Sequence, residues 1–426
     1  MLMTTKGIKK KGAVSLYIVL FATLLVTVIA LGFTRIMMNE RRQVSDTDLS
    51  QTAYDSAMTG IEDARLAVIR YNECLTTGNP FPAGNNTRSC ADIISVMRTG
   101  QPVTGTINVC DQVSFILGRP GINETPIHEG GFTGDGTFEQ TDQAYTCVRI
   151  SDDTINFLSQ LDAQTRSRLI PLRTGGIPFN QVVISWSRAR NFAPGANPIA
   201  SLSSVTSGQP PISFPASWPA DAPPVLSASI MQSGSNFNLS SFETAQSGNT
   251  NRAAMMLVPV SSGGIANNTI TAAQVTATNN QTLNNPFPVN CVSNFGFSGG
   301  YSCSVTINLP APIGGGARHD GTSFLQLESI FPITTHDFQV TVRDTNQAGS
   351  PIVPLVGVQV AVDSTGRNSD ALRRIEGRIE VVDTAFPFPE WTVQLNGETG
   401  ASFCKNFIVT INNWVTGQDV FNNANC

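Results

Sequence analysis

Residues 13–33 read AVSLYIVLFATLLVTVIALGF, and this stretch decides how the chain is organised. It holds no charged residue and no proline, and Gly32 is its one glycine. A helix of this length spans about 31 Å at about 1.5 Å per residue, close to the thickness of the hydrocarbon core of a bilayer. Lysines at 9–11 precede it, and arginines at 35, 41 and 42 follow it. We therefore predict a membrane-spanning helix near the N-terminus.

Three interpretations of this apolar helix are open. A cleaved secretory signal peptide has the same basic start, but its apolar run is usually about 7–15 residues long, and no A-x-A-like site stands out after residue 33. The second interpretation is a plain membrane anchor. The third is a leader that is cleaved before the apolar run, so that the helix is retained.

The residues around Gly12 favour the third interpretation. The run Lys9-Lys10-Lys11-Gly12 followed by Ala13-Val14-Ser15-Leu16 resembles the leader of type IV pilins and pseudopilins. The resemblance implies cleavage between Gly12 and Ala13 by a prepilin peptidase, followed by methylation of the new N-terminus. Glycine lacks a Cβ atom, so a protease can approach its backbone closely. The helix residues assigned to the membrane and the fibre are Leu16, Val19, Leu20, Leu24, Ile29 and Phe33.

Position five of the predicted mature chain departs from the family pattern. Most major pilins carry a glutamate there, which pairs with the free amine of a neighbouring subunit during assembly. This chain carries Tyr17 instead. The departure favours a minor pilin, at the fibre tip or in low copy number, or a pilin-like protein that never assembles.

The helix is predicted to continue beyond the membrane as an amphipathic extension. The chain has 25 prolines, but the first is Pro80, so no proline interrupts a helix before that point. Apolar residues recur at steps of three to five and form one stripe, which we expect to pack on a globular head. Residues 48–57 resemble the small-residue region of minor pilins of the PilX type. The stripe consists of Val44, Leu49, Ala53, Ala57, Ile61, Ala64, Val68 and Tyr71.

The charge content bounds the class of protein. Of 426 residues, 13% are charged and the net charge is −5, whereas about 25% is typical of globular proteins. Four of the five lysines lie in the first 11 residues, and Lys405 is the fifth. No basic patch is visible, which argues against nucleic-acid binding through broad positive charge. Low charge with many Ser, Thr, Asn and Gly residues is common in exported β-rich proteins.

All eight cysteines lie beyond the apolar helix, and their even number predicts disulfides formed in an oxidising compartment. Eight cysteines allow 105 pairings. Short loops favour sequence neighbours, with free buried thiols as the alternative. The predicted pairs are Cys74–Cys90, Cys110–Cys147, Cys291–Cys303 and Cys404–Cys426.

The predicted fold class is α+β: a long N-terminal helix packed on the antiparallel β-sheet of a pilin head, with a large β-rich insertion. Residues 191–317 contain three charged residues and read as a separate β-rich module or an insertion, with disorder as the alternative. The predicted organisation is a leader (1–12), a transmembrane helix (13–33), its amphipathic extension (34–75), a first part of the head (76–190), a low-charge module (191–330) and a C-terminal sheet (331–426).

Local patterns predict several elements of the head. Residues 91–97 read as a short helix, and residues 154–170 read as a longer one that ends at Pro171. Residues 181–186, 338–342, 356–362, 374–382 and 393–395 read as strands, with a polar hairpin loop at 363–370. The proline-rich stretch 207–226, which includes Trp218, reads as a linker or a surface loop.

No catalytic motif is present: the sequence has no G-x-S-x-G, no H-E-x-x-H and no P-loop. It has no C-x-x-C, and His128, His319 and His336 are scattered, so we expect no metal site, no cofactor and no enzymatic activity. The resemblance implies a bacterial membrane protein whose C-terminal part lies outside the cell, on a pilus or the cell surface. Its implied partners are the membrane, other pilin subunits, the prepilin peptidase and a ligand on a host or neighbouring cell.

Overall fold

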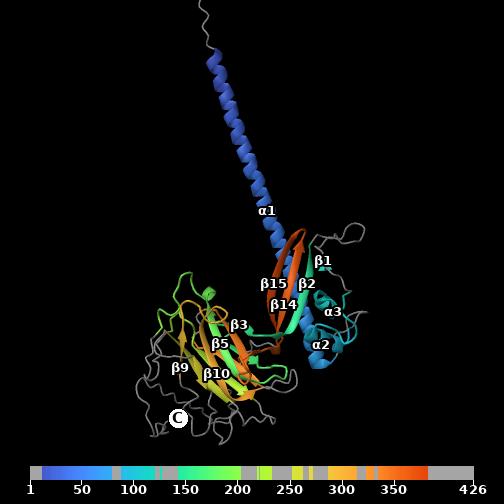
Figure 1. Cartoon of the computed structure of the whole chain (residues 1–426), viewed down its shortest axis with the longest axis vertical. Helices are drawn as coiled ribbons and strands as arrows, with labels where there is room; N and C mark the ends of the chain where they lie inside the picture. Colours follow the sequence, from blue (N-terminus) through green and yellow to red (C-terminus); the bar gives the residue numbers. More distant parts are fainter. Residues whose placement is uncertain are drawn as a thin grey trace, which may run out of the picture. The chain divides into compact units, whose positions relative to one another are not determined.

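The computed structural model describes residues 12–78, 88–119, 125–126, 143–202, 218–219, 221–232, 252–261, 268–271, 286–313, 323–330 and 334–381. The chain divides into two compact units (Figure 1). The helix unit comprises residues 1–150 and 362–377, and the strand unit comprises residues 151–361 and 378–426. The helix unit contains one long helix and part of a sheet, and the strand unit is built mainly of strands, so the predicted α+β class is confirmed.

Helix α1 runs without interruption over Gly12–Thr77, which is 66 residues. Its length is therefore about 100 Å at about 1.5 Å per residue. No proline lies within it, and hydroxyl side chains such as Thr52 and Thr59 bond to carbonyl groups of the preceding turn. The predicted apolar helix and its amphipathic extension are thus one element, as Figure 1 shows.

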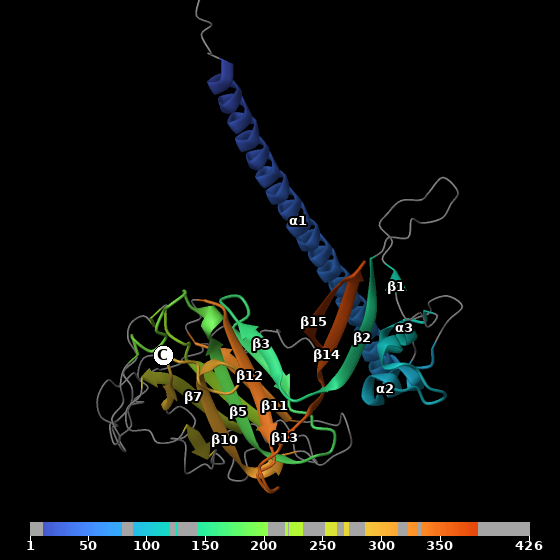
Figure 2. The same cartoon turned by 45° about the horizontal axis from the view of Figure 1, so that its top comes forward.

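A four-stranded sheet in the order β1-β2-β14-β15 lies along the second half of α1 (Figure 2). Its strands are β1 (Thr125–Pro126), β2 (Gln143–Thr154), β14 (Leu355–Asn368) and β15 (Ala371–Glu380). The predicted hairpin is present, but its loop was predicted too long. Strand β14 continues to Asn368, and only Ser369 and Asp370 make the turn.

Small residues let this sheet approach α1 closely. Ala53, Ala57 and Ala64 are fully buried. A Cβ atom at Gly366 of β14 would clash with the backbone of Ala53 and Ala57, so only glycine fits there. The hydroxyl of Ser364 donates to the carbonyl oxygen of Ala57 at 2.8 Å.

The predicted stripe is confirmed over residues 53–71, where Val68 and Tyr71 are also buried. Val44 is 68% exposed and does not pack on the sheet. The sheet that covers the stripe also differs in part from the prediction, because strand β2 comes from residues 143–154 rather than from the C-terminal part.

The rest of the helix unit contains α2 (Cys90–Thr99), the 3₁₀ helix η1 (Val109–Asp111) and α3 (Gln112–Ile116). Helix α2 confirms the short helix predicted at 91–97. Ser89 caps it by accepting a hydrogen bond from the Asp92 amide, and Gly100 ends it with φ 76°. Its buried face consists of Ile93, Val96 and Met97.

The strand unit contains an 11-stranded sheet in the order β13-β12-β5-β10-β9-β7-β6-β11-β4, with β3 also paired to β12 and β8 to β10. Neighbours are antiparallel except for the pairs β7–β9 and β8–β10. These strands come from both inside and outside the stretch 191–330. They are β3 (Phe157–Leu161), β4 (Ser167–Pro171), β5 (Phe179–Arg188), β6 (Leu226–Gln232), β7 (Arg252–Ser261), β8 (Thr269–Thr271), β9 (Pro286–Cys291), β10 (Tyr301–Ile313), β11 (Ser323–Ser329), β12 (His336–Arg343) and β13 (Ile352–Val353).

The strand unit encloses one hydrophobic core in which large side chains dominate. The side chains of four of them are at most 1% exposed: Phe157, Phe179, Trp186 and Phe338. Strands β5 and β12 confirm the predictions at 181–186 and 338–342. The strand predicted at 393–395 lies outside the described residues.

The helix predicted at 154–170 is wrong. Residues 157–161 form β3, which pairs with β12, and residues 167–171 form β4, which pairs with β11. The spacing of Leu158, Leu161 and Leu169 is compatible with a helix, but both segments gain long-range strand pairing that a local pattern does not reveal.

The prediction of a linker or surface loop is wrong for the described part of 207–226. Trp218 and Val225 belong to the core of the strand unit. The indole Nε1 of Trp218 donates to the carbonyl oxygen of Pro223 at 2.9 Å, so its polar group is satisfied. Prolines fit here because this backbone pairs with few strand neighbours.

Candidate functional site

The first half of α1 exposes an unusually large apolar surface. Every residue from 17 to 48 is exposed. Between Tyr17 and Met38 the large apolar side chains are 49–74% exposed on all sides of the helix. We call residues 17–38 the exposed segment. A water-soluble surface rarely leaves so large an apolar area uncovered, so this segment is a candidate interaction site.

The exposed segment is suited to lipid by length and by hydrogen bonding. Among the described residues, α1 is the one helix long and apolar enough to cross a membrane. Its 22 residues span about 33 Å. The hydroxyls of Thr23, Thr27 and Thr34 donate to carbonyl oxygens three or four residues earlier, at 2.7–2.9 Å. No side-chain hydroxyl of these threonines therefore needs water.

The structure places most of the predicted helix residues on this segment. Val19, Leu20, Leu24, Ile29 and Phe33 are all exposed, and Tyr17 is 74% exposed. Gly12, Ala13 and Leu16 lie in the first turns of α1. The leader before Gly12 lies outside the described residues, so the cleavage site stays a prediction.

Arg35 lies near the end of the exposed segment, and further polar residues follow directly after it. Glu40, Arg41 and Arg42 lie on the next turn of α1. Guanidinium groups at such a position lie at the level of lipid headgroups when the preceding helix crosses a bilayer.

The second half of α1 carries a buried polar cluster that the sequence did not reveal. Asp63 lies on α1, Tyr145 on β2 and Arg119 just after α3. Arg119 donates to Asp63 through both terminal nitrogens, and the Tyr145 hydroxyl donates to the same carboxylate. Burial opposes the charge of Arg119, but its hydrogen bonds to Asp63 raise the pKa of the guanidinium overall. No sequence signal connects these residues, since 56 positions separate Asp63 from Arg119.

Three of the four predicted disulfides are present: Cys74–Cys90, Cys110–Cys147 and Cys291–Cys303. The first joins the end of α1 to the start of α2, and the second joins η1 to β2. Cys404 and Cys426 lie outside the described residues. Together, the disulfides and the exposed apolar helix indicate a membrane-anchored or secreted protein.

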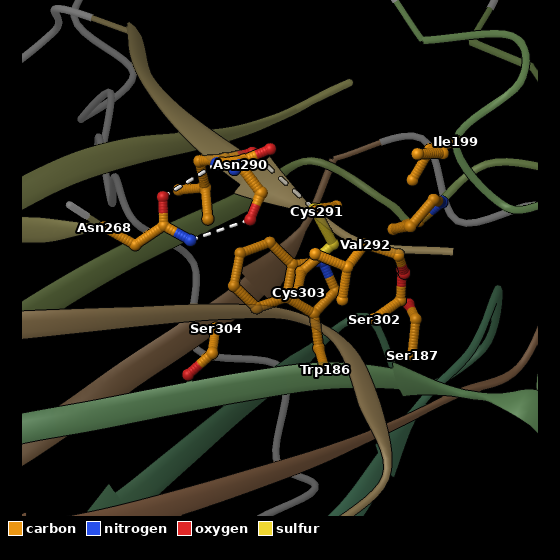
Figure 3. The surroundings of a disulfide bond; sticks show 12 residues. Trp186, Ser187, Ile199, Asn268, Asn290, Cys291, Val292, Ser302, Cys303 and Ser304 are labelled. Carbon is orange, nitrogen blue, oxygen red and sulfur yellow. Dashed lines mark hydrogen bonds between the residues drawn. A yellow bond between two sulfur atoms is a disulfide. The ribbon is translucent and has the colours of Figure 1, made fainter. Parts of the chain in front are cut away.

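The third disulfide crosses adjacent strands β9 and β10, where Cys291 lies opposite Cys303. Figure 3 shows Asn268 next to it. The Asn268 amide donates to the carbonyl oxygen of Asn290 at 2.7 Å and accepts from the Asn290 amide at 2.9 Å. The Asn268 side chain thus makes the two backbone hydrogen bonds to Asn290 that a neighbouring strand would otherwise make.

The strand unit also brings a serine and a histidine together. The Oγ atom of Ser187 lies 3.0 Å from Nδ1 of His336, and Thr334 Oγ1 lies 2.9 Å from the other ring nitrogen. Ser187 has φ 65°. However, Ser187 is 0% exposed and His336 is 4% exposed, so no substrate can reach the pair from solvent. Burial lowers the pKa of His336 to about 4, although the charge of Asp337 opposes this shift.

Asp337 lies beside this pair and is held by three side chains. Arg190 donates to it through two nitrogens, and Gln160 and Asn191 each donate at 2.9 Å. Burial raises the pKa of Asp337, but these hydrogen bonds outweigh it and leave the pKa below its usual value. Both carboxylate oxygens are occupied, so Asp337 is not available as a catalytic base for His336 or for a ligand.

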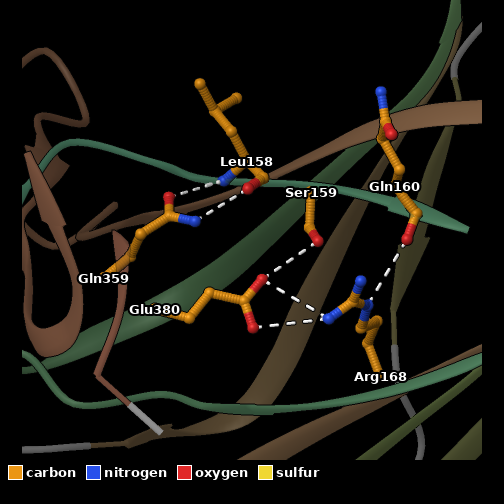
Figure 4. A network of polar contacts seen from close by, with 6 residues as sticks. All are labelled: Leu158, Ser159, Gln160, Arg168, Gln359 and Glu380. Carbon is orange, nitrogen blue, oxygen red and sulfur yellow. Dashed lines mark hydrogen bonds and ion pairs between the residues drawn. The ribbon is translucent and has the colours of Figure 1, made fainter. Parts of the chain in front are cut away.

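Polar side chains also close the edge of β3 (Figure 4). The amide of Gln359 bonds both backbone groups of Leu158, at 3.0 and 2.8 Å. Glu380 accepts from Ser159 at 3.1 Å and pairs with Arg168 at 3.3 Å. An edge strand whose backbone is bonded in this way offers no template for another chain.

Among the described residues no group of three or more His, Cys, Asp or Glu side chains is placed to hold a metal ion. The predicted lack of enzymatic activity stays a prediction. No protein family, curated protein or solved structure matches this chain.

Proposed function

We propose that the protein is a pilin-like subunit of a type IV pilus or a similar fibre, displayed on a bacterial surface. In this proposal the peptidase removes residues 1–12, the exposed segment stays in the membrane, and both disulfide-bonded units lie outside. The observation that carries the proposal is that one unbroken helix has two different halves. One half exposes large apolar side chains all round, and the other packs small residues against a sheet.

A second feature of α1 supports association with other helices. Tyr54, Met58, Leu66 and Ile69 are 38–50% exposed, although the buried alanines lie on the same half of the helix. Their spacings of 4, 8 and 3 residues place them on one side of α1, away from the sheet. In a fibre, this side would extend the apolar contact of the exposed segment.

The role of the large strand unit follows from the same proposal. Its size and the absence of glutamate at Tyr17 favour a minor subunit, at the tip or in low copy number, which contacts a host cell, a neighbouring cell or another surface. No enzymatic activity and no cofactor is proposed for it.

A second candidate is a single-pass anchored surface protein that does not polymerise. Tyr17 favours it, because a phenol cannot form the ion pair with a neighbouring N-terminal amine that the family uses. The two candidates share the anchor and differ in assembly.

The decisive experiment maps the mature N-terminus by mass spectrometry. The pilin-like proposal predicts a chain that begins at a methylated Ala13. A Gly12→Val variant should keep its leader, because a branched side chain obstructs the scissile bond, whereas Gly7→Val in the same leader should be processed normally. A mature native chain that retains residues 1–12 would contradict the pilin-like proposal.

Assembly is tested separately by shearing cells. The first candidate predicts the chain in the sheared fibre fraction together with other pilins. If a processed chain occurs only in membranes, the second candidate holds.

A further inference from the structure

Strand β15 has a free edge. It is the last strand of the helix-unit sheet, and among the described residues it pairs with β14 alone. Both overall views show it on the side of β14 away from β2 (Figures 1 and 2). Unpaired backbone groups along such an edge can pair with a strand of another chain. The edge of β3, by contrast, is closed by the side chains of Gln359 and Arg168, which bond the outward backbone groups of Leu158 and Gln160.

The register of the β14–β15 hairpin shows which backbone groups of β15 point outward. The amide of Val381 donates to the carbonyl oxygen of Val358, and two residues make the turn. In an antiparallel pair, residues that bond to the neighbouring strand alternate with residues whose amide and carbonyl groups point away from it. Odd-numbered residues of β15 therefore bond to β14. The even-numbered ones, which include Arg374 and Glu376, present their backbone groups at the free edge.

Two exposed side chains on this edge carry opposite charges. The side chain of Arg374 is 61% exposed and that of Glu376 is 80% exposed. Asp363 accepts hydrogen bonds from Nε and one terminal nitrogen of Arg374, which orients the guanidinium. The other terminal nitrogen has no partner among the described residues, so it can still donate. Glu376 lies 3.8 Å from Arg374 on its own strand, which is too far for a hydrogen bond.

These two residues match each other when the strand meets a second copy of itself. If two β15 strands pair in antiparallel around Ile375, Arg374 of each copy lies directly opposite Glu376 of the other, and the outward backbone groups of both residues meet. A slip of two residues in either direction places Glu376 opposite Glu376 or Arg374 opposite Arg374, which is repulsive. We infer that β15 forms an antiparallel pair with β15 of a second copy of this chain, with Arg374 and Glu376 as reciprocal partners.

The direction of α1 determines which copies can pair. Arg373 donates to Ser50 and Gly377 lies against Ile61, so β15 runs in the same direction as α1 within the helix unit. Antiparallel β15 strands therefore carry antiparallel α1 helices, and the two exposed segments point in opposite directions. This consequence, unlike the strand pairing itself, rests on the membrane insertion in the proposed function. The paired copies then belong to two separate membranes or fibres.

Charge exchange tests the pairing in the full-length protein in detergent, with sedimentation velocity as the measure of dimer formation. Glu376→Arg should weaken the dimer about thirtyfold, because two attractive pairs become repulsive. Arg374→Glu should weaken it similarly. A mixture of the two variants should form heterodimers, since each arginine of one chain then lies opposite a glutamate of the other. The control, Glu62→Arg, makes the same charge change at a 64% exposed side chain of α1 and should dimerise like the wild type.

A cysteine at the centre of the pair tests the register. Opposite Cα atoms at a position without hydrogen bonds between the strands are about 4.5 Å apart, within reach of a disulfide. Ile375→Cys should therefore give a disulfide-linked dimer under mild oxidation. Leu372→Cys should not, because its counterpart in the second copy would lie about 20 Å away along the strand.

Dimer formation by Glu376→Arg at the wild-type affinity would overturn the inference, as would a wild type that stays monomeric at about 100 μM. In a monomer, hydrogen exchange then shows what the edge meets instead. Protected amides at residues 374 and 376 would mean that another part of the same chain covers it, and rapidly exchanging amides would mean that it is open to a different protein. Both results contradict self-pairing. Mapping of the mature N-terminus is independent of these measurements, so the proposed function and this inference can fail separately.

Discussion

The two halves of α1 show how one helix serves two environments. The exposed segment, residues 17–38, presents leucine, isoleucine, valine, phenylalanine and methionine on every side. The packed segment, which we define as residues 53–71, buries Ala53, Ala57 and Ala64 against the sheet. Large side chains gain most from transfer into lipid, whereas small ones let two backbones approach each other.

This difference shows that the apolar character of a helix does not by itself reveal whether lipid or protein covers it. Both halves lack proline, and both carry apolar side chains. What distinguishes them is side-chain volume and its distribution around the helix axis. Gly366 of β14 lets the sheet contact the packed segment, because even one methyl group at Gly366 would clash with the backbone of α1.

The largest expected effect comes from placing charges in the exposed segment. Leu24→Asp/Ile29→Asp should disfavour insertion by about 6 kcal/mol, since each buried carboxylate costs about 3 kcal/mol at the centre of a membrane helix. The fraction of chain in alkali-washed membranes measures this. Met58→Asp/Leu66→Asp is the matched control on the second half of α1 and should stay in the membrane. Equal release of both variants from the membrane would contradict the proposed difference in environment between the two halves of α1.

Acid should destabilise the strand unit through His336. The pKa of His336 is lowered from 6.5 to about 4 in the folded protein, mainly by burial. Between these pH values the unfolded chain binds a proton that the folded chain does not. The stability is therefore fully present above pH 6.5 and falls as the pH approaches 4, by about 3 kcal/mol in total.

The fluorescence of Trp186 and Trp218, both in the core of the strand unit, reports this loss in urea titrations at a series of pH values. His336→Asn should be less stable at neutral pH but should lose most of this pH dependence. An unchanged slope in that variant would assign the acid sensitivity to other groups.

A smaller effect tests the close contact in the packed segment. Gly366→Ala should destabilise the helix unit by about 2 kcal/mol, because the added methyl overlaps the backbone of α1. Gly377→Ala on β15 is the control, since its Cβ atom would meet only the flexible end of Ile61 at an ordinary distance. Thermal unfolding followed by circular dichroism should separate the two variants. Matching melting temperatures would mean that the helix and sheet are not in close contact.

The smallest expected effect concerns the polar cluster of the packed segment. Asp63→Asn should cost about 1–2 kcal/mol, because Arg119 loses its ion pair but keeps one acceptor. The cost is modest since the Arg119 side chain is 42% exposed and water can solvate it. Urea unfolding of the helix unit measures it. A Glu62→Gln change, on the exposed pair with Arg65, should be neutral.

Local sequence patterns predicted helix α1 and strand β14 well. The uncharged run, the late first proline and the alternation of Val356–Val362 each report on neighbours a few residues away, and the structure confirms them. The same kind of pattern failed at residues 154–170 and around Trp218. There the decisive partners, β11, β12 and the core of the strand unit, are far away in the sequence.

The sequence by itself determined that an apolar helix stands near the N-terminus and that it continues as an amphipathic one, and it favoured the neighbouring pairs that form the three described disulfides. These properties depend on composition, periodicity and short loops, which are local. Only the tertiary structure decided that Gly366 is needed against Ala53, that Asp63 pairs with Arg119, and that Arg373 donates a hydrogen bond to Ser50. Each of these contacts joins segments tens to hundreds of residues apart, and only folding brings them together.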